Sequence, residues 1–199
     1  MAKHNELKAP FFDQERLRIC AKDFLDRFHP SYSLPIPIEE IIEFQLKIDI
    51  VPIPGLQRGF EIDAFLSQDL KSISVDEAIY TGRLNRYRFS LAHETAHRVL
   101  HSEIYKELSS NTVADWKRNI SSLPDREYRY LESHANAFAG LILVPPTKLA
   151  EEFHRAMGKL KEEDLSSTLL PILIASELAS VFDVSSQTLQ IRLRDDHLN

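Results

Sequence analysis

Apolar residues recur at helical spacing over most of the chain, so the sequence predicts a mainly helical protein. In one clear case, Leu17, Ala21 and Phe24 fall on one side of a helix that His29-Pro30 would end. The helical pattern is found in residues 13–28, 38–45, the stretch from 84 to 100, 125–144, 147–157, 165–182 and 186–194. The chain therefore has enough amphipathic helices to enclose a core.

One short region has instead the alternating, β-branched pattern that is typical of strands. It comprises residues 47–53, 59–66 and 70–75, with Ser67-Gln68-Asp69 as a turn between the last two. Three neighbouring short strands predict an antiparallel sheet. Further along the chain, the polar stretch 103–124 predicts an irregular or partly helical connection. The expected fold class is therefore α+β: a small antiparallel sheet of about three strands, packed against two central helices, with additional helices at both ends.

The C-terminal part, 166–199, has the pattern of a helix-turn-helix, with the turn at Asp183–Val184 and Ser185 or Ser186 capping the second helix. No linker separates it from the rest. We therefore expect a single domain, 1–199, with 166–199 as a helical C-terminal subdomain. Its two arginines are outnumbered by four acidic residues, which makes it a poor phosphate binder, so we expect packing or protein recognition rather than direct nucleic acid binding.

Composition narrows the class of protein. The 199 residues are 43% hydrophobic, enough to bury a core, and the net charge of −6 argues against a general affinity for nucleic acid. Cys20 is the single cysteine, which excludes disulfides and thiolate clusters within one chain. No apolar run reaches the roughly 18 residues of a membrane span, and the first residues lack the pattern of a signal peptide. We therefore expect a cytoplasmic protein without membrane contacts.

The sequence His93-Glu94-Thr95-Ala96-His97 has the spacing of a helical metal site. Positions four apart on a helix differ by about 40° around its axis, so both imidazoles project from one face and can reach one ion. Glu94 lies about 100° from His93, where its carboxylate can accept a proton from a water molecule. The pattern favours a zinc metallopeptidase with Glu94 as the catalytic base over an accidental pair of histidines.

A catalytic zinc site needs a third protein ligand. His101 continues the row of histidines, but it lies eight residues from His93, about 12 Å along a straight helix, and a packing or supporting role is expected for it. Glu132 is the better donor, because Asn136 shares its helix face and can support a ligand. We therefore expect Zn²⁺ to be bound by His93, His97 and Glu132. Four residues stay open as oxyanion stabilisers: Tyr80, Arg86, Tyr105 and Tyr130.

At these two places the sequence resembles the ImmA/IrrE family of metallo-endopeptidases. The stretch from Arg88 to His97 resembles the family's RFTLAHELGH segment, and the stretch from Glu132 to Pro145 resembles its second motif, E-x-E-A-N-x-F-A followed by L-L-x-P. The resemblance assigns the third-ligand role to Glu132 and a supporting role to Asn136. Ala96 replaces a common glycine, which is harmless in a helix, and His134 replaces an acidic residue, which leaves its contact with substrate open.

The resemblance implies a cytoplasmic, bacterial or phage-related enzyme with a gluzincin-like HExxH-plus-Glu ligand set. Its expected partner is a protein substrate, a helix-turn-helix transcriptional repressor whose cleavage switches on gene expression. A second class of function stays open. The chain would then be a metal-binding regulatory protein with little peptidase activity, which acts by binding a partner or DNA through its C-terminal segment.

Overall fold

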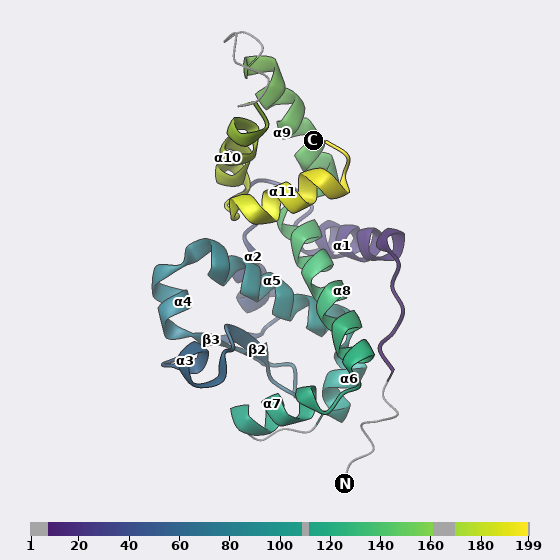
Figure 1. Cartoon of the computed structure of the whole chain (residues 1–199), viewed down its shortest axis with the longest axis vertical. Helices are drawn as coiled ribbons and strands as arrows, with labels where there is room; N and C mark the ends of the chain where they lie inside the picture. Colours follow the sequence, from purple (N-terminus) through teal and green to yellow (C-terminus); the bar gives the residue numbers. More distant parts are fainter. Residues whose placement is uncertain (1–7, 109–111, 161–169, 199) are drawn as a thin grey trace.

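The computed structural model describes residues 8–108, 112–160 and 170–198. Helices dominate the elongated molecule, and a small sheet lies in its lower half (Figure 1). In chain order the elements are α1 (Gln14–Phe28), α2 (Ile38–Glu40), the π-helical turn η2 (Ile41–Gln45), β1 (Asp49–Ile53), α3 (Leu56–Phe60), β2 (Ala64–Leu66), β3 (Ser72–Asp76), α4 (Glu77–Gly82), α5 (Leu84–Leu100), α6 (Ser102–Glu107), α7 (Val113–Ser121), α8 (Asp125–Leu143), α9 (Pro146–Leu160), α10 (Leu170–Phe182) and α11 (Ser186–Asp195). The α+β class is confirmed.

The sheet has the strand order β1-β3-β2 and is mixed. β1 pairs with β3 in parallel, with Ile50 opposite Ile73, whereas β2 pairs with β3 in the antiparallel direction, with Phe65 opposite Ser74. The prediction of a purely antiparallel sheet is therefore wrong. After β1 the chain passes through α3 to the far edge and returns through β2, so β3 enters between the two earlier strands and runs parallel to the first.

Two short helices next to the sheet were not predicted. α3 begins after Gly55 and ends before Glu61, which both have left-handed backbone angles (φ 73° and 59°). The predicted strand 59–66 is therefore wrong in its first half, and only Ala64–Leu66 pairs. α4 follows β3 directly, because the Asp76 carboxylate accepts hydrogen bonds from the N–H groups of Ala78 and Ile79 and so caps its first turn.

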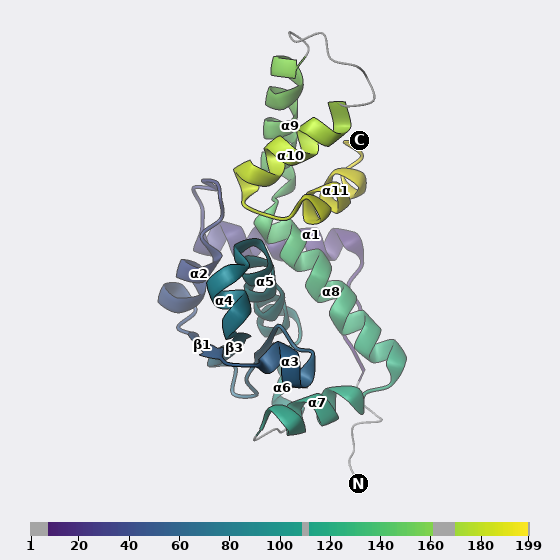
Figure 2. The same ribbon diagram turned by 60° about the vertical axis from the view of Figure 1, so that its left-hand side comes forward.

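The centre of the molecule is the pair α5 and α8, which cross in close contact (Figure 2). Small side chains line their contact and let the two backbones approach: Ala92, Ala96, Ala135 and Ala139, all 0% exposed. α1 packs against the other side of α8, and β2 and β3 pack beside α5. The predicted core of two helices and a small sheet is therefore present. These contacts fix how the side chains of α5 and α8 face one another.

The stretch 103–124 contains helices α6 and α7. α7 lies next to β2, with the rings of Trp116 and Phe65 5.4 Å apart and the Lys117 ammonium donating to the Phe60 carbonyl. A small apolar cluster that includes Ile104, Leu108 and Ile120 supports these helices. The predicted partly helical connection thus contains two helices, of which α7 packs beside β2.

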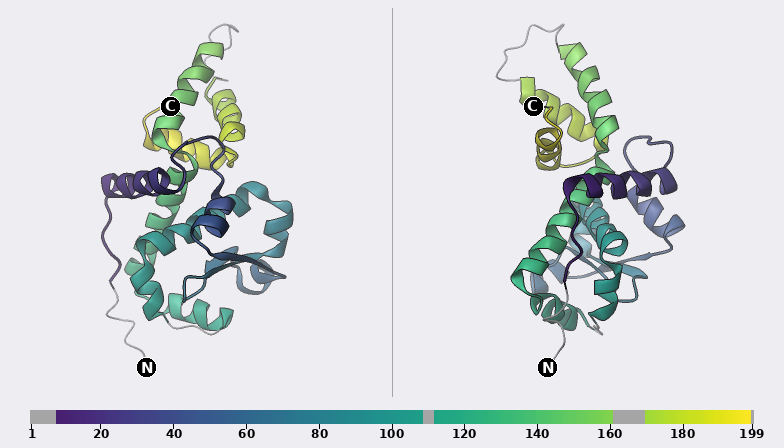
Figure 3. Two further views of the ribbon diagram at one scale, coloured as in Figure 1. Left: turned by 180° about the vertical axis from the view of Figure 1, so that it is seen from behind. Right: turned by 90° about the vertical axis from the view of Figure 1, so that its right-hand side faces the viewer.

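Helices α9, α10 and α11 gather at one end of the molecule, beyond the C-terminal end of α8, and the views from behind and from the side agree on this (Figure 3). Ser185 caps α11 by accepting a hydrogen bond from the Thr188 N–H. Two predictions extend beyond the described residues. They are the predicted helix 165–182, at residues 165–169, and the predicted subdomain 166–199, at residues 166–169 and 199. Within the described part of the chain, no helix is long and apolar enough to cross a membrane.

Candidate metal centre

Three side chains from α5 and α8 converge on one point. The Nε2 atoms of His93 and His97 are 3.0 Å apart. The Glu132 carboxylate faces both, with Oε2 3.3 Å from His93 Nε2 and Oε1 3.6 Å from His97 Nε2. In a tetrahedral zinc site with bonds of about 2.0–2.1 Å, neighbouring ligand atoms are about 3.3 Å apart. The three groups therefore have the spacing of ligands around a single ion.

The outer ring nitrogens of both histidines are held by protein groups. His93 Nδ1 is 3.1 Å from Asn136 Oδ1, and His97 Nδ1 is 3.0 Å from His101 Nδ1. Metal-binding histidines nearly always donate their second N–H to such a partner, because this fixes the tautomer and the ring orientation. Each ring is thus held with Nε2 directed inward, and the donor set fits a metal ion.

Glu94 lies beside the triangle formed by His93, His97 and Glu132 but makes a different contact. Its Oε2 accepts a hydrogen bond of 2.8 Å from the Leu66 N–H, on the outer edge of β2. The carboxylate is 5% exposed and within 4.8 Å of the nitrogens of His93 and His97. The pKa of Glu94 is raised to about 8, with burial as the largest cause; His93 and the Leu66 N–H act to lower this pKa, and the nearby Glu132 acts to raise it. No sequence pattern reveals a backbone donor such as Leu66.

The pKa values of His93 and His97 are shifted in opposite directions. Burial lowers the pKa of His97 well below its usual value, as do the neighbouring His93 and His101, so its imidazole is neutral and able to bind a metal. Burial also lowers the pKa of His93, but interactions with Glu132, Glu94 and Asn136 outweigh it, and the net shift is upward. Glu132 therefore interacts with His93 through charge as well as geometry.

His101 is 1% exposed and packs between His97 and His134, with ring centroids 5.1 and 5.8 Å away. The pKa of His101 is lowered to about 3, first by burial and then by the neighbouring His134 and His93, so His101 is neutral. A neutral His101 can accept the N–H of His97 at its Nδ1. His134 itself points away from the triangle, stacked on Tyr130 and edge-on to Phe12.

The four open oxyanion candidates are now distinguishable. Tyr105 is buried against His97, with ring centroids 5.0 Å apart. The others are engaged elsewhere: Tyr80 packs on Tyr87, Arg86 pairs with Asp63, and Tyr130 packs on His134. Of the four, Tyr105 is thus the one beside the triangle.

The sequence interpretation missed Tyr128. It lies four residues before Glu132, on the same face of α8, and its side chain is 39% exposed. Burial raises the pKa of Tyr128, and the charges of Glu132 and Glu94 raise it further. The spacing of four from a predicted ligand was the feature that could have revealed it.

The contact between His101 and His97 leads to a testable prediction. Replacing His101 with leucine removes the acceptor for the His97 N–H, and zinc affinity is expected to fall about 10–100-fold. Asparagine at this position offers an amide oxygen near the place of Nδ1, so His101→Asn is expected to keep most of the affinity. Competition with a chromogenic chelator measures both constants. Equal losses in the two variants would mean that His101 acts through packing alone.

Comparison with known proteins identifies the family. Residues 81–194 match the sequence model of a peptidase family described as the IrrE N-terminal-like domain. The chain belongs to this family. The match covers more than half of the chain and both motifs, and it confirms the ImmA/IrrE resemblance. Membership gives the chain a metallopeptidase-family role.

The fold has a known counterpart. Among solved structures, the chain is similar to a Mycobacterium tuberculosis transcriptional regulator, with a TM-score of 0.54 and 18% identity over 90% of this chain and 46% of that one. The chain thus spans less than half of that regulator, and the likeness shows a shared fold alone. No curated protein sequence matches this member of the ImmA/IrrE family.

Family membership and geometry point to the same place. Among the described residues, His93, Glu94 and His97 form a compact group of potential ligands, with one atom of each within 4.8 Å of the others. Peptidases of the ImmA/IrrE family are typically metal-dependent, and this group is where the chain could hold the ion. Glu132 adds the carboxylate from α8.

Proposed function

We propose that the chain is a zinc-dependent endopeptidase in which His93, His97 and Glu132 hold the ion and Glu94 is the catalytic base. The observation that carries this proposal is the convergence of the three ligand groups from α5 and α8 within 3.0–3.6 Å. Two nitrogens, one carboxylate and a remaining open position are the ligand set of catalytic rather than structural zinc sites. Asn136 supports the site by orienting His93.

In this proposal the zinc ion, the Glu94 carboxylate and the Leu66 N–H have different tasks. A bound zinc ion supplies the Lewis acidity that activates water and polarises the scissile carbonyl. Glu94 accepts a proton from the attacking water and delivers it to the leaving amine. The Leu66 N–H holds the Glu94 carboxylate on the side of the triangle that faces β2, which keeps the base beside the reacting atoms.

The protein substrate that we propose is a helix-turn-helix transcriptional repressor, whose cleavage switches on gene expression. This rests on the ImmA/IrrE resemblance, and the transcriptional regulator with the same fold is compatible with it. A cytoplasmic peptidase needs restricted access, because free cleavage would damage its own cell. The edge strand β2 offers such restriction, since a substrate segment added as an extended strand would be gripped by backbone hydrogen bonds.

The test uses the zinc-loaded chain with two substrates: the helix-turn-helix repressor encoded next to its gene, and casein. We expect cleavage of the repressor at one site and little hydrolysis of casein. A chelator should abolish cleavage, and added zinc should restore it. Electrophoresis and intact-mass spectrometry follow both reactions. Degradation of casein into many fragments with the repressor left intact would overturn the regulatory role while keeping the enzyme class.

The alternative, a DNA-binding regulator, has less support. Arg192 of α11 is 4% exposed and paired with Asp196, and Arg194 is next to Asp195. Of the two cations of the predicted helix-turn-helix, Arg192 is thus buried and already paired, and Arg194 has an acidic neighbour, so the segment is poorly suited to phosphate contacts. Clear binding of mixed DNA by the chain at low salt would reverse this preference.

A further inference from the structure

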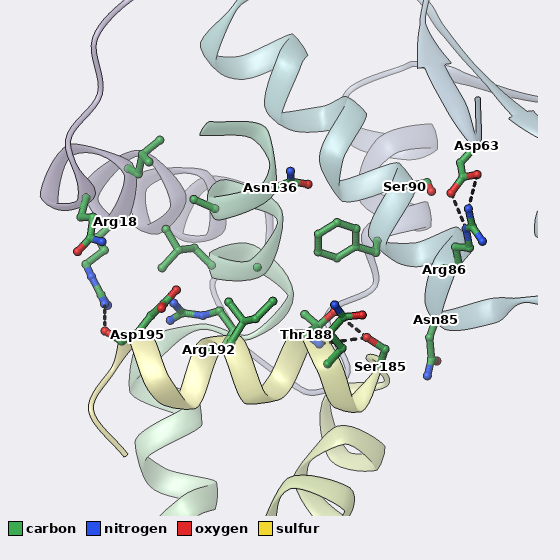
Figure 4. A pocket seen from close by; sticks show the side chains of 18 residues that line it. Arg18, Asp63, Asn85, Arg86, Ser90, Asn136, Ser185, Thr188, Arg192 and Asp195 are labelled. Carbon is green, nitrogen blue, oxygen red and sulfur yellow. Dashed lines mark hydrogen bonds and ion pairs between the residues drawn. The ribbon is translucent and has the colours of Figure 1, made fainter. Parts of the chain in front are cut away.

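A second feature lies beside the metal centre, an open pocket of about 700 Å³ lined mainly by residues of α1, α5, α8 and α11. We call it the α11 pocket, because α11 forms one wall along its length (Figure 4). Its apolar lining comes from all four helices: Leu17, Phe89, Ala137, Leu141 and Ile191. The volume is that of a ligand-binding site rather than a packing defect.

The α11 pocket and the candidate metal centre meet at Asn136. Asn136 lines the pocket and also holds His93 through its side-chain oxygen, 3.1 Å from Nδ1. Phe89, on the pocket wall, lies four residues before His93, about 6 Å along the helix axis. An extended peptide advances about 3.3–3.6 Å per residue, so the pocket begins within about two residues of a bond held at the metal centre.

The pocket also reaches the start of edge strand β2, through Asp63. A segment added along β2 would therefore pass Glu94 at Leu66 and approach the pocket at the other end of the strand. The pocket and the Glu94 carboxylate thus lie near opposite ends of β2.

The arginines that line the pocket are paired with nearby aspartates. Figure 4 shows Arg86 and Asp63 at one end and Arg18 with Asp195 at the other. Arg86 forms two hydrogen bonds with Asp63, of 2.5 and 2.7 Å, and Arg18 lies 2.5 Å from Asp196. A charged ligand group would have to compete with these pairs, whereas the apolar middle has no competing partner. The lining therefore favours aliphatic and aromatic side chains.

The α11 wall is fixed in place from α8. The Arg192 side chain lies across Gly140, where an added Cβ would come within 3.0 Å of Arg192 Cδ, and its Nε donates to the Val144 carbonyl. This orients α11 so that Thr188, Ile191 and Asp195 line the pocket. The second helix of the predicted helix-turn-helix thus faces the metal-centre side of the molecule.

We propose that the α11 pocket is a specificity subsite that binds a bulky apolar side chain of the polypeptide substrate within about two residues of the cleaved bond. The inference rests on the proposed peptidase function and names the substrate chemistry for the same site. The pocket then decides which segment of a protein is cut, and α11 serves to select substrate.

Ala137→Phe tests this, because Ala137 is an exposed α8 residue whose enlargement fills the pocket without disturbing the core. Ala78→Phe is the matched control, an exposed helical alanine on α4 that lines neither site. Each zinc-loaded protein is incubated with a peptide library made from digested bacterial proteins, and mass spectrometry identifies the cleaved bonds. Thermal unfolding confirms that both variants are folded.

We expect the wild type and Ala78→Phe to prefer Leu, Ile, Phe or Met at one position near the cleaved bond. Ala137→Phe should cleave those peptides at least about tenfold more slowly and shift the preference to Gly, Ala or Ser. An unchanged preference in Ala137→Phe would overturn the subsite.

A binding experiment separates this inference from the proposed function. Peptides of the same library are captured on immobilised Glu94→Gln protein and on the Glu94→Gln, Ala137→Phe double variant. If apolar peptides bind the Glu94→Gln protein but not the double variant, the subsite is supported. This holds even if the wild type cleaves no peptide, because absence of cleavage would refute only the peptidase function. Equal capture of apolar peptides by the two proteins would overturn the subsite.

Discussion

Replacement of Glu94 with glutamine is expected to reduce peptide cleavage at least about a hundredfold and to leave zinc content unchanged. The amide cannot accept a proton from water, so the base is lost. Its oxygen can still accept the 2.8 Å hydrogen bond from the Leu66 N–H, so the side chain keeps its place. The measurements are kcat/KM on the repressor and zinc per chain by elemental mass spectrometry.

Glu151→Gln is the control for this experiment, because Glu151 is an exposed carboxylate on α9, paired with Lys148 and remote from the metal centre. It should retain full activity and full zinc content. Cleavage by Glu94→Gln within a few fold of the wild type would remove Glu94 from the role of base. A parallel loss of zinc would instead make Glu94 a ligand.

The site residues on α5 and α8 could be predicted from the sequence because the same helical spacing places both the core residues and the ligands. In α5 the spacing of four that places Ala92 and Ala96 in the core also places His93 and His97 together on an adjacent face. The same holds in α8, where Glu132 and Asn136 share a face beside the buried Ala135. Since helix geometry is local, the two halves of the site could be predicted without knowing how the helices cross.

The sheet could not be predicted in this way, because strand order and direction depend on contacts between distant residues. The parallel pairing of β1 with β3 exists because α3 turns the chain before β2, and that turn depends on left-handed residues at Gly55 and Glu61. A left-handed glutamate has no sequence signature. The cap at Asp76, in contrast, was readable, and it would have revealed α4.

In the candidate site, tertiary contacts account for what was missed. The hydrogen bond from Leu66 to Glu94 joins a strand to a helix through a backbone group, so no side-chain pattern records it. The α11 pocket needs four helices that lie far apart in the sequence. Sequence reasoning could therefore name the reactive groups but not the surface that would select a substrate.

Replacement of Glu132 with alanine is expected to weaken zinc binding at least about a hundredfold, because a direct ligand contributes more than the 10–100-fold that supporting residues contribute. Glu132 is the contribution of α8 to the triangle, with its oxygens 3.3 and 3.6 Å from the two Nε2 atoms. Its side chain is 33% exposed, so the free energy of unfolding of the metal-free variant should lie within about 0.5 kcal/mol of that of the metal-free wild type. Chelator competition and denaturant unfolding measure the two quantities.

The comparison between Glu132→Ala and Glu94→Gln decides which carboxylate binds the metal and which serves as base. Both lie close to the same two imidazoles, and only their different contacts, with Nε2 atoms for Glu132 and with the Leu66 N–H for Glu94, separate them. Ser133→Ala, next to Glu132 on an exposed side of α8, should retain zinc and activity. Equal zinc content in Glu132→Ala and Glu94→Gln would sink the assignment of Glu132, since the geometry that joins it to the triangle would then have no energetic consequence.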